Sequence, residues 1–292
     1  MADAPTILGP EDMAKLGRYR FAVRLMVEGW LSGRHRAKGR GSGSDFLEYR
    51  AYAPGGDPRL VDWRVFARTD RLQLRTFENE THAECHLMVD SSASMGFRGL
   101  GPVSKLAFAS HFAACLAWLV VRGADRVSLH LFDEQVSFSL PPGSTAAHLN
   151  ECLRRLEGNR PGGKTDVPRA LERSRHLLVR PGVLVLISDF YCEPEALREA
   201  LNPYLHRGCR VVLVQVSDPA ELELPGQGLS RYVDMETGER LTFRPELLRK
   251  AYAERVREHR AALHAMAESR GMLFLSAQTD QSVFPLLDAL SS

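Results

Sequence analysis

The sequence lacks several patterns that point to an enzyme or to a secreted protein. It contains no GxSxG motif, which would favour a serine hydrolase, and no HExxH motif, which would favour a zinc protease. Its five cysteines form no CxxC pair, and most lie inside apolar runs, so we expect buried free thiols in a reducing compartment. These absences predict a cytoplasmic protein that is not an enzyme.

Signal-peptide and membrane patterns are also missing, and charge of one sign does not dominate. The first residues do not show the charged-then-apolar order of a signal peptide. The longest apolar run, residues 106–121, is short for a membrane span and is interrupted by Ser110 and His111. The net charge is only +2, and the densest basic stretch, residues 18–40, suits a solvated arm or a docking face as well as nucleic acid. We therefore predict neither a membrane span nor a nucleic-acid partner.

The first 84 residues predict an N-terminal extension that is helical and then β-rich. Apolar residues recur at roughly helical spacing within residues 1–40, and GRGSGSD at 39–45 predicts a flexible connector. Residues 46–84 carry apolar side chains among turn patterns such as PGGDP, which favours a few short strands.

From residue 85 to 292 the pattern changes to alternating strands and helices. Continuous apolar strands separated by helices predict a parallel, doubly wound α/β sheet that is covered on both faces. Residues 219–245 are rich in turns and predict an insertion with a hairpin at METGE. The expected strands cover residues 85–90, 126–140, 182–190, 209–218 and 272–280, and the expected helices cover 105–123, 148–158, 167–179, 195–208 and 246–270.

Two of the expected strands end in aspartate, and hydroxyl side chains follow on nearby loops. Asp90 opens the segment DSSAS, which adds Ser92 and Ser94, while Thr165 lies in a Gly-rich loop and Asp189 ends another strand. Ligands of parallel sheets gather at the carboxyl ends of the strands. Five oxygen-bearing side chains suit a hard cation such as Mg²⁺, and at least one coordination position would remain for an outside ligand.

These residues resemble the metal-ion-dependent adhesion site of von Willebrand factor A domains, whose motif they match one for one. A narrower resemblance, carried by residues 41–80 and by DPAELELPGQG and DMETGERL within 218–241, is to the bacterial domain of unknown function 58 family. The resemblance implies a von Willebrand factor A fold that binds Mg²⁺, Mn²⁺ or Ca²⁺. It also implies association with MoxR-type AAA+ ATPases, which are thought to act as chaperones in assembling other proteins.

The expected function is therefore metal-dependent protein recognition by an adaptor to such an ATPase. Only two of the five side chains are carboxylates, so a bound ion would remain electrophilic. We expect the ATPase or its client protein to donate an acidic side chain to the ion.

A second hypothesis is nucleotide hydrolysis. The loop from Gly158 to Thr165 satisfies the phosphate-binding pattern GxxxxGK[ST]. That motif needs a strand before the loop, whereas the residues before Gly158 have helical spacing and carry several charges. The hypothesis also leaves Asp90, Ser92 and Ser94 unexplained.

A charged and aromatic cluster between residues 57 and 68 has two interpretations. A structural ion-pair network that joins the extension to the sheet is one, and partner binding is the other. The second interpretation makes Asp62, Trp63 and Arg68 candidate partner-binding residues.

Overall fold

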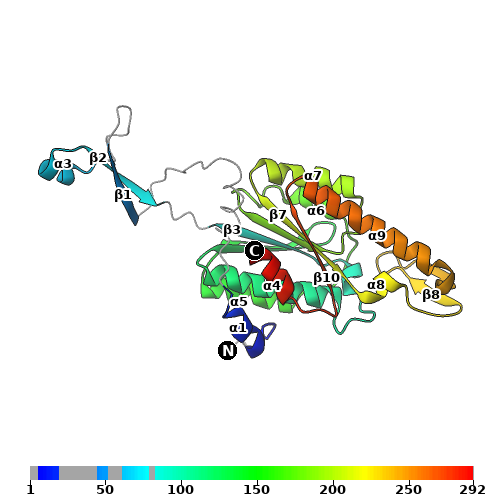
Figure 1. Ribbon diagram of the computed structural model, residues 1–292. Helices are drawn as coiled ribbons and strands as arrows, with labels where there is room; N and C mark the ends of the chain where they lie inside the picture. The colour runs from blue at the N-terminus through cyan, green and yellow to red at the C-terminus, as the bar shows by residue number, and fades with distance from the viewer. Residues whose placement is uncertain (1–5, 20–44, 52–60, 79–82, 292) are drawn as a thin grey trace. The chain divides into compact units, whose positions relative to one another are not determined.

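A computed structural model of the protein describes residues 6–19, 45–51, 61–78 and 83–291, with only the backbone for 45–51, 74–78 and 291 (Figure 1). The chain divides into two compact units, of which one comprises Met1–Glu28 with Ala83–Ser292 and the other Gly29–His82. This division differs from the predicted boundary after residue 84. Helix α1 (Pro10–Leu16) belongs with the large unit because Leu16 is fully buried in its core.

The smaller unit combines a hairpin with a helix. Strand β1 (Asp45–Ala51) pairs antiparallel with β2 (Gln73–Glu78), and α3 (Trp63–Thr69) lies between them in the chain. The segment around Trp63 was predicted to be strand and is helical instead. Its cause is local: the Asp62 carboxylate caps the helix by accepting hydrogen bonds from the N–H groups of Arg64 and Val65 at 3.0 and 3.2 Å.

The large unit is built around a six-stranded sheet of order β10-β7-β6-β3-β4-β5. All neighbouring strands run parallel except β5, which pairs antiparallel with β4 at one edge. The predicted α/β architecture with a mostly parallel sheet is thus confirmed. The strands are β3 (Glu84–Asp90), β4 (Arg126–Phe132), β5 (Val136–Gly143), β6 (Val183–Ser188), β7 (Arg210–Ser217) and β10 (Leu273–Gln278).

Helices cover both faces of the sheet because its central strands are apolar on both sides. Along β3, Leu87 and Val89 join one apolar cluster while Met88, which points to the opposite face, joins the other. The first cluster includes residues of the helices α4 (Lys105–Arg122), α5 (Ala146–Glu157) and α10 (Phe284–Ser291). The second cluster includes residues of α6 (Val167–Ser174), α7 (Pro194–His206) and α9 (Pro245–Ser269). The two groups of helices lie on opposite sides of the sheet in Figure 1.

Helix α4 is apolar nearly all round. By length and composition it is the one helix in the described ranges that could cross a membrane, and 72% of it is buried inside the protein. A helix in the core of an α/β domain can have the same length and apolar composition, so the composition of α4 follows from its place against the sheet.

A hairpin follows β7, in the turn-rich segment where the sequence predicted one. Helix α8 (Pro219–Glu223) is followed by β8 (Ser230–Val233) and β9 (Arg240–Phe243), which pair only with each other. The rings of Tyr232 and Phe243 stack with centroids 4.7 Å apart. The two strands lie largely at the surface, so few buried contacts hold them in place.

The strand order places a switch point beside β3. The chain passes from β3 to β4 on one side and later returns to β6 on the other side. Parallel sheets form a crevice at such a point, outside the carboxyl ends of the strands. Asp90 is the last residue of β3, and Asp189 directly follows β6, so both lie at this crevice.

Candidate metal centre

Asp90 and Asp189 are both buried at the switch point, with exposed fractions of 0% and 2%. The Ser92 N–H donates to Asp90 Oδ1 at 2.9 Å, and the Ser188 hydroxyl donates to Asp90 Oδ2 at 2.6 Å. Burial, together with repulsion from Asp189, raises the pKa of Asp90 to about 7. A cation at this position would relieve the cost of keeping Asp90 ionised.

The predicted serines connect the DSSAS loop to the second aspartate. Ser92 Oγ lies 3.1 Å from Ser94 Oγ, and the Ser94 hydroxyl donates to Asp189 Oδ2 at 2.9 Å. Ser92 is fully buried, whereas Ser94 is partly exposed. Four of the five predicted residues are therefore linked by hydrogen bonds into one network.

The loop that carries Thr165 is bound to the same DSSAS loop. The Gly162 N–H donates to the Ser91 carbonyl at 2.8 Å, and the Ala93 N–H donates to the Gly163 carbonyl at 3.1 Å. Gly96 approaches the same loop so closely that an added methyl group would lie 2.8 Å from Pro161 Cγ. Thr165 is thus at the predicted edge of the sheet, although its own hydroxyl bonds elsewhere.

Lys105 is a residue of this site that the sequence analysis missed. Its ammonium is fully buried at the start of α4 and lies 2.8 Å from Asp189 Oδ2 and 2.6 Å from Glu221 Oε1. Burial alone would lower the pKa of Lys105, but the two carboxylates outweigh it, and the net pKa is raised. A lysine inside an apolar helix was the available indication, because a buried ammonium requires an acidic partner.

Glu236, in the turn between β8 and β9, is the second missed residue. The Thr165 hydroxyl donates to Glu236 Oε1 at 2.8 Å, and the Thr165 N–H donates to Oε2 at 3.1 Å. The two residues are 71 positions apart, and no local pattern connects them. Thr165 therefore engages a carboxylate that the same chain supplies.

The donor set suits a hard divalent cation. Mg²⁺ prefers oxygen ligands, and the side chains of Ser92, Ser94, Asp189 and Thr165 offer hydroxyl and carboxylate oxygens that hydrogen bonds hold in place. Lys105 balances only one charge of Asp90, Asp189 and Glu221. Among the described residues no group of three or more His, Cys, Asp or Glu side chains forms a metal cluster, as expected for a set that relies on hydroxyls.

Comparison with known proteins identifies the family. Residues 48–262 match the family described as "Protein of unknown function DUF58". The chain belongs to the DUF58 family. Uncharacterized proteins of Mycobacterium tuberculosis and Mycobacterium bovis are each 30% identical to it over 276 residues, which cover 93% of this chain and 86% of each relative.

Solved structures with some similarity share less of the sequence. BatB from Bacteroides thetaiotaomicron is 18% identical, with a TM-score of 0.49, and the match covers 72% of this chain and 95% of that one. The von Willebrand factor domain of the type V pili tip protein Mfa5 from Porphyromonas gingivalis is 12% identical, with a TM-score of 0.39 and coverage of 71% and 93%.

In this DUF58 protein, the phosphate-binding pattern does not lie in a phosphate-binding loop. The preceding element is helix α5, which ends at Glu157, where a buried strand would be required. The N–H groups of Gly158, Asn159, Gly162 and Thr165 already donate to protein oxygens. Lys164 is exposed.

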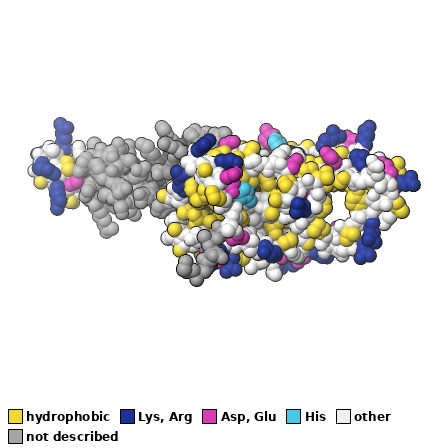
Figure 2. All heavy atoms as spheres, turned by 90° about the horizontal axis from the view of Figure 1, so that it is seen from below, with side chains coloured by type: hydrophobic (Ala, Val, Ile, Leu, Met, Phe, Trp, Pro, Cys, Tyr) yellow, Lys and Arg dark blue, Asp and Glu magenta, His cyan; other side chains and the backbone are white. Residues whose placement is uncertain are grey.

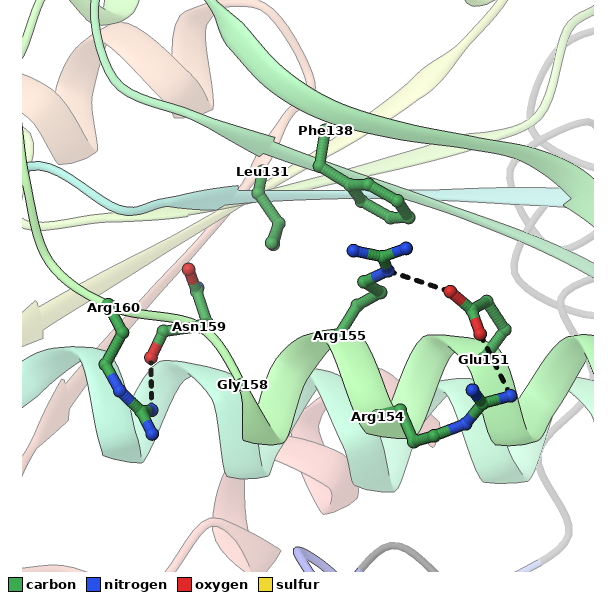
Figure 3. Close-up of a pocket in the computed structure, with 8 residues that line it drawn as sticks. All are labelled: Leu131, Phe138, Glu151, Arg154, Arg155, Gly158, Asn159 and Arg160. Atoms are coloured by element: carbon green, nitrogen blue, oxygen red, sulfur yellow. Dashed lines mark hydrogen bonds and ion pairs between the residues drawn. The ribbon is translucent and has the colours of Figure 1, made fainter. Parts of the chain in front are cut away.

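A surface pocket adjoins the start of this loop (Figure 3). Its arginines are occupied: Glu151 pairs with Arg154 at 3.0 Å and with Arg155 at 2.8 Å, and the Arg155 guanidinium lies 4.6 Å from the centre of the Phe138 ring. Because Arg154 and Arg155 already have partners, the pocket is less able to bind an anion. The pocket is lined by Leu131, Phe138, Glu151, Arg154, Arg155, Gly158, Asn159 and Arg160.

The candidate partner-binding residues lie in the smaller unit of the DUF58 chain. Asp62 caps α3, Trp63 begins the helix with 60% of its surface exposed, and the Arg68 side chain donates to the Arg64 carbonyl at 3.3 Å. Asp57 and Arg59, from the same predicted cluster, lie outside the described residues. An exposed tryptophan suits a contact surface, while Asp62 is explained by its cap.

Charges on the described surface are mixed. On the face in Figure 2, Lys and Arg side chains are scattered among acidic and apolar ones, without one continuous basic area in the described part of that face. This distribution agrees with the net charge of +2.

Proposed function

We propose that this protein is a non-catalytic, metal-dependent protein-binding module that acts in the cytoplasm as an adaptor to a MoxR-type AAA+ ATPase or its client. The observation that carries the proposal is the network of Asp90, Ser92, Ser94 and Asp189 at the switch point of the sheet. With Thr165 it would hold Mg²⁺, or alternatively Mn²⁺ or Ca²⁺. The ATPase partner rests on the family resemblance alone.

The hydrogen bonds of the serines support binding over catalysis. A nucleophilic serine needs a general base within hydrogen-bond reach. Ser92 pairs with Ser94, and the Asp189 Oδ2 atom that accepts from Ser94 also accepts from the buried Lys105 ammonium, so this carboxylate oxygen is engaged by a cation and is not free to take up a proton. All five cysteines are free, which agrees with a reducing compartment.

Burial differs across the site in a way that suits recognition. Asp90 and Ser92 are fully buried, whereas Ser94 and Thr165 are partly exposed and therefore accessible from solvent. A partner carboxylate would complete the coordination from this side. Because binding free energies are reciprocal, metal and partner would raise each other's affinity by the same factor.

The hairpin beside the site offers apolar contact area. Val233, Met235 and Leu241 expose 52%, 48% and 66% of their surface, and a methyl group at Gly96 would lie 3.6 Å from Met235 Cε. Exposed apolar side chains next to a polar site are typical of protein-binding surfaces. A partner that supplies an acidic residue would contact these side chains as well.

Calorimetry with a purified MoxR-type ATPase tests the proposal. Wild-type protein is expected to bind in Mg²⁺ and to lose at least about tenfold in affinity in EDTA, a factor typical of coupled sites. Asp90→Ala is expected to bind weakly in both conditions while its circular dichroism stays that of the wild type. Lys164→Ala is the matched control, since Lys164 is an exposed neighbour of Thr165 and should bind as the wild type does. Equal affinities for every variant in both buffers would show that the metal is not the recognition element.

A further inference from the structure

Glu236 is an acidic residue of this chain that contacts one of the proposed metal ligands, Thr165. Both of its oxygens accept hydrogen bonds from Thr165, one from the hydroxyl at 2.8 Å and one from the backbone N–H at 3.1 Å. Thr165 is the one predicted ligand that does not bond to the Asp90 and Asp189 network. Its exposed side is therefore already capped by an acidic side chain of this chain.

The turn that carries Glu236 is preorganised by its own hydrogen bonds. Asp234 Oδ1 accepts from the N–H groups of Glu236 and Thr237, each at 2.8 Å. The Gly238 N–H donates to the Asp234 carbonyl at 2.9 Å, and the positive φ of +73° at Gly238 suits glycine. Glu236 is thus presented from a fixed turn.

The rest of the hairpin is held loosely, which allows it to leave. Strands β8 and β9 pair only with each other, and an isolated two-stranded hairpin is marginally stable. At the tip, the described contacts with the site include the Glu236 carboxylate, which accepts from Thr165, and the Met235 side chain near Gly96. Elements with few buried contacts open at low free-energy cost.

We infer that Glu236 is an internal ligand of the metal centre, and that the β8–β9 hairpin is a built-in competitor which an acidic partner must displace. This inference rests on the proposed metal-dependent function and adds how access to the site is controlled. The Glu236 carboxylate is in direct hydrogen-bond contact with the hydroxyl of a proposed metal ligand, and carboxylate oxygens are ligands that Mg²⁺ prefers. A carboxylate tethered to the same chain has a high effective concentration, so only a partner with further contacts would replace it. The exposed apolar side chains of the hairpin would supply such contacts.

The test compares wild-type protein with Glu236→Ala and uses Mn²⁺ alone as the probe. The matched control is Glu239→Gln, an exposed acid in the same hairpin segment. Water-proton relaxation reports the waters bound to Mn²⁺, and acetate serves as an added carboxylate. In the absence of metal, hydrogen exchange of the Thr165 amide reports whether the hairpin keeps its contact with Thr165 through Glu236.

We expect the Thr165 amide of Glu236→Ala to exchange about tenfold faster than in the wild type, because it loses a charged acceptor. The Mn²⁺ complex of this variant should hold an additional exchangeable water and should release it when acetate is added. Wild type and Glu239→Gln should show neither change. Mn²⁺ binding with the same hydration and the same acetate response in all three proteins would overturn the internal ligand and leave the metal centre standing. Mn²⁺ binding to none of them would overturn both the inference and the proposed function.

Discussion

At the carboxyl end of β7, Asp218 accepts hydrogen bonds from more donors than Asp90 and Asp189 do at the ends of β3 and β6. Asp218 accepts hydrogen bonds at 2.9 to 3.1 Å from five donors, namely the N–H groups of Gly99, Leu100, Gly101 and Ala220 and the hydroxyl of Thr279. Burial alone would raise its pKa, but the four backbone donors outweigh it, and the net pKa is lowered.

Asp90 shows the opposite shift, since its pKa is raised by burial and by Asp189. The same residue type at neighbouring strand ends therefore serves two purposes. Asp218 fixes the loop at residues 99–101, whereas the charged form of Asp90 is disfavoured by burial and by Asp189. The number of donors thus distinguishes a carboxylate that the protein itself stabilises from one that a bound cation would stabilise.

The largest effect is expected from Lys105→Met, which removes the one cation that the protein supplies to Asp189 and Glu221. Breaking a buried ion pair costs about 3–5 kcal/mol because the remaining charges lose their compensation. Urea unfolding at pH 7 in EDTA measures this loss, and Mg²⁺ should restore part of it. Lys164→Met, at an exposed lysine, is the control and should change stability by less than about 0.5 kcal/mol. A loss below about 1 kcal/mol for Lys105→Met would contradict this account of the site's charge balance.

Asp218→Ala is expected to have the next largest effect, a loss of about 2–3 kcal/mol in the free energy of unfolding, because several amides lose their acceptor. Asp218→Asn should lose less, because it retains one carbonyl oxygen. The pKa of Asp218 is lowered on folding, so its contribution is present above the unfolded value of 3.8 and is lost as the pH falls through the folded value. The free energies of unfolding of wild type and Asp218→Asn should therefore differ by a constant amount near neutral pH, and this difference should shrink below a pH of about 3.8. A constant difference down to pH 2 would show that the charge of Asp218 is unimportant.

The smallest effect is expected from Asp90→Asn. Removing a buried charge that faces Asp189 should leave stability in EDTA unchanged or higher by about 1 kcal/mol, as is common for substitutions at functional sites. Thermal unfolding should show that Mg²⁺ raises the melting temperature of the wild type and not that of the variant. If Asp90→Asn were as destabilising as Asp218→Ala in EDTA, the two carboxylates would not differ as we describe.

Much of the large unit could be predicted from the sequence, because its strands and helices have clear apolar patterns. The buried runs that became β3, β6 and β7 were long and apolar, and the aspartates at the ends of β3 and β6 marked the switch point. The DSSAS motif then predicted that Ser92, Ser94 and Asp189 would meet, and the structure joins them by hydrogen bonds.

The parts that were missed depend on tertiary contacts or on a weak local pattern. Glu236 reaches Thr165 across 71 positions, and the turn sequence alone indicates only a hairpin. Lys105 meets Glu221 across 116 positions. Helix α3 was mistaken for strand because Val61 and Trp63 favour strands by composition, while the Asp62 cap, which was available in the sequence, indicated a helix.

The large unit is assembled from two stretches of chain, with the smaller unit inserted between them. The entropy of closing a loop grows only with the logarithm of its length, by about 0.6 kcal/mol for each doubling. The length of the inserted unit therefore has little effect on the loop-closure entropy that the large unit loses on folding. A shortened chain that starts at residue 83 would behave differently, because it would also lose α1 and uncover the surface of α4 against which Leu16 is buried.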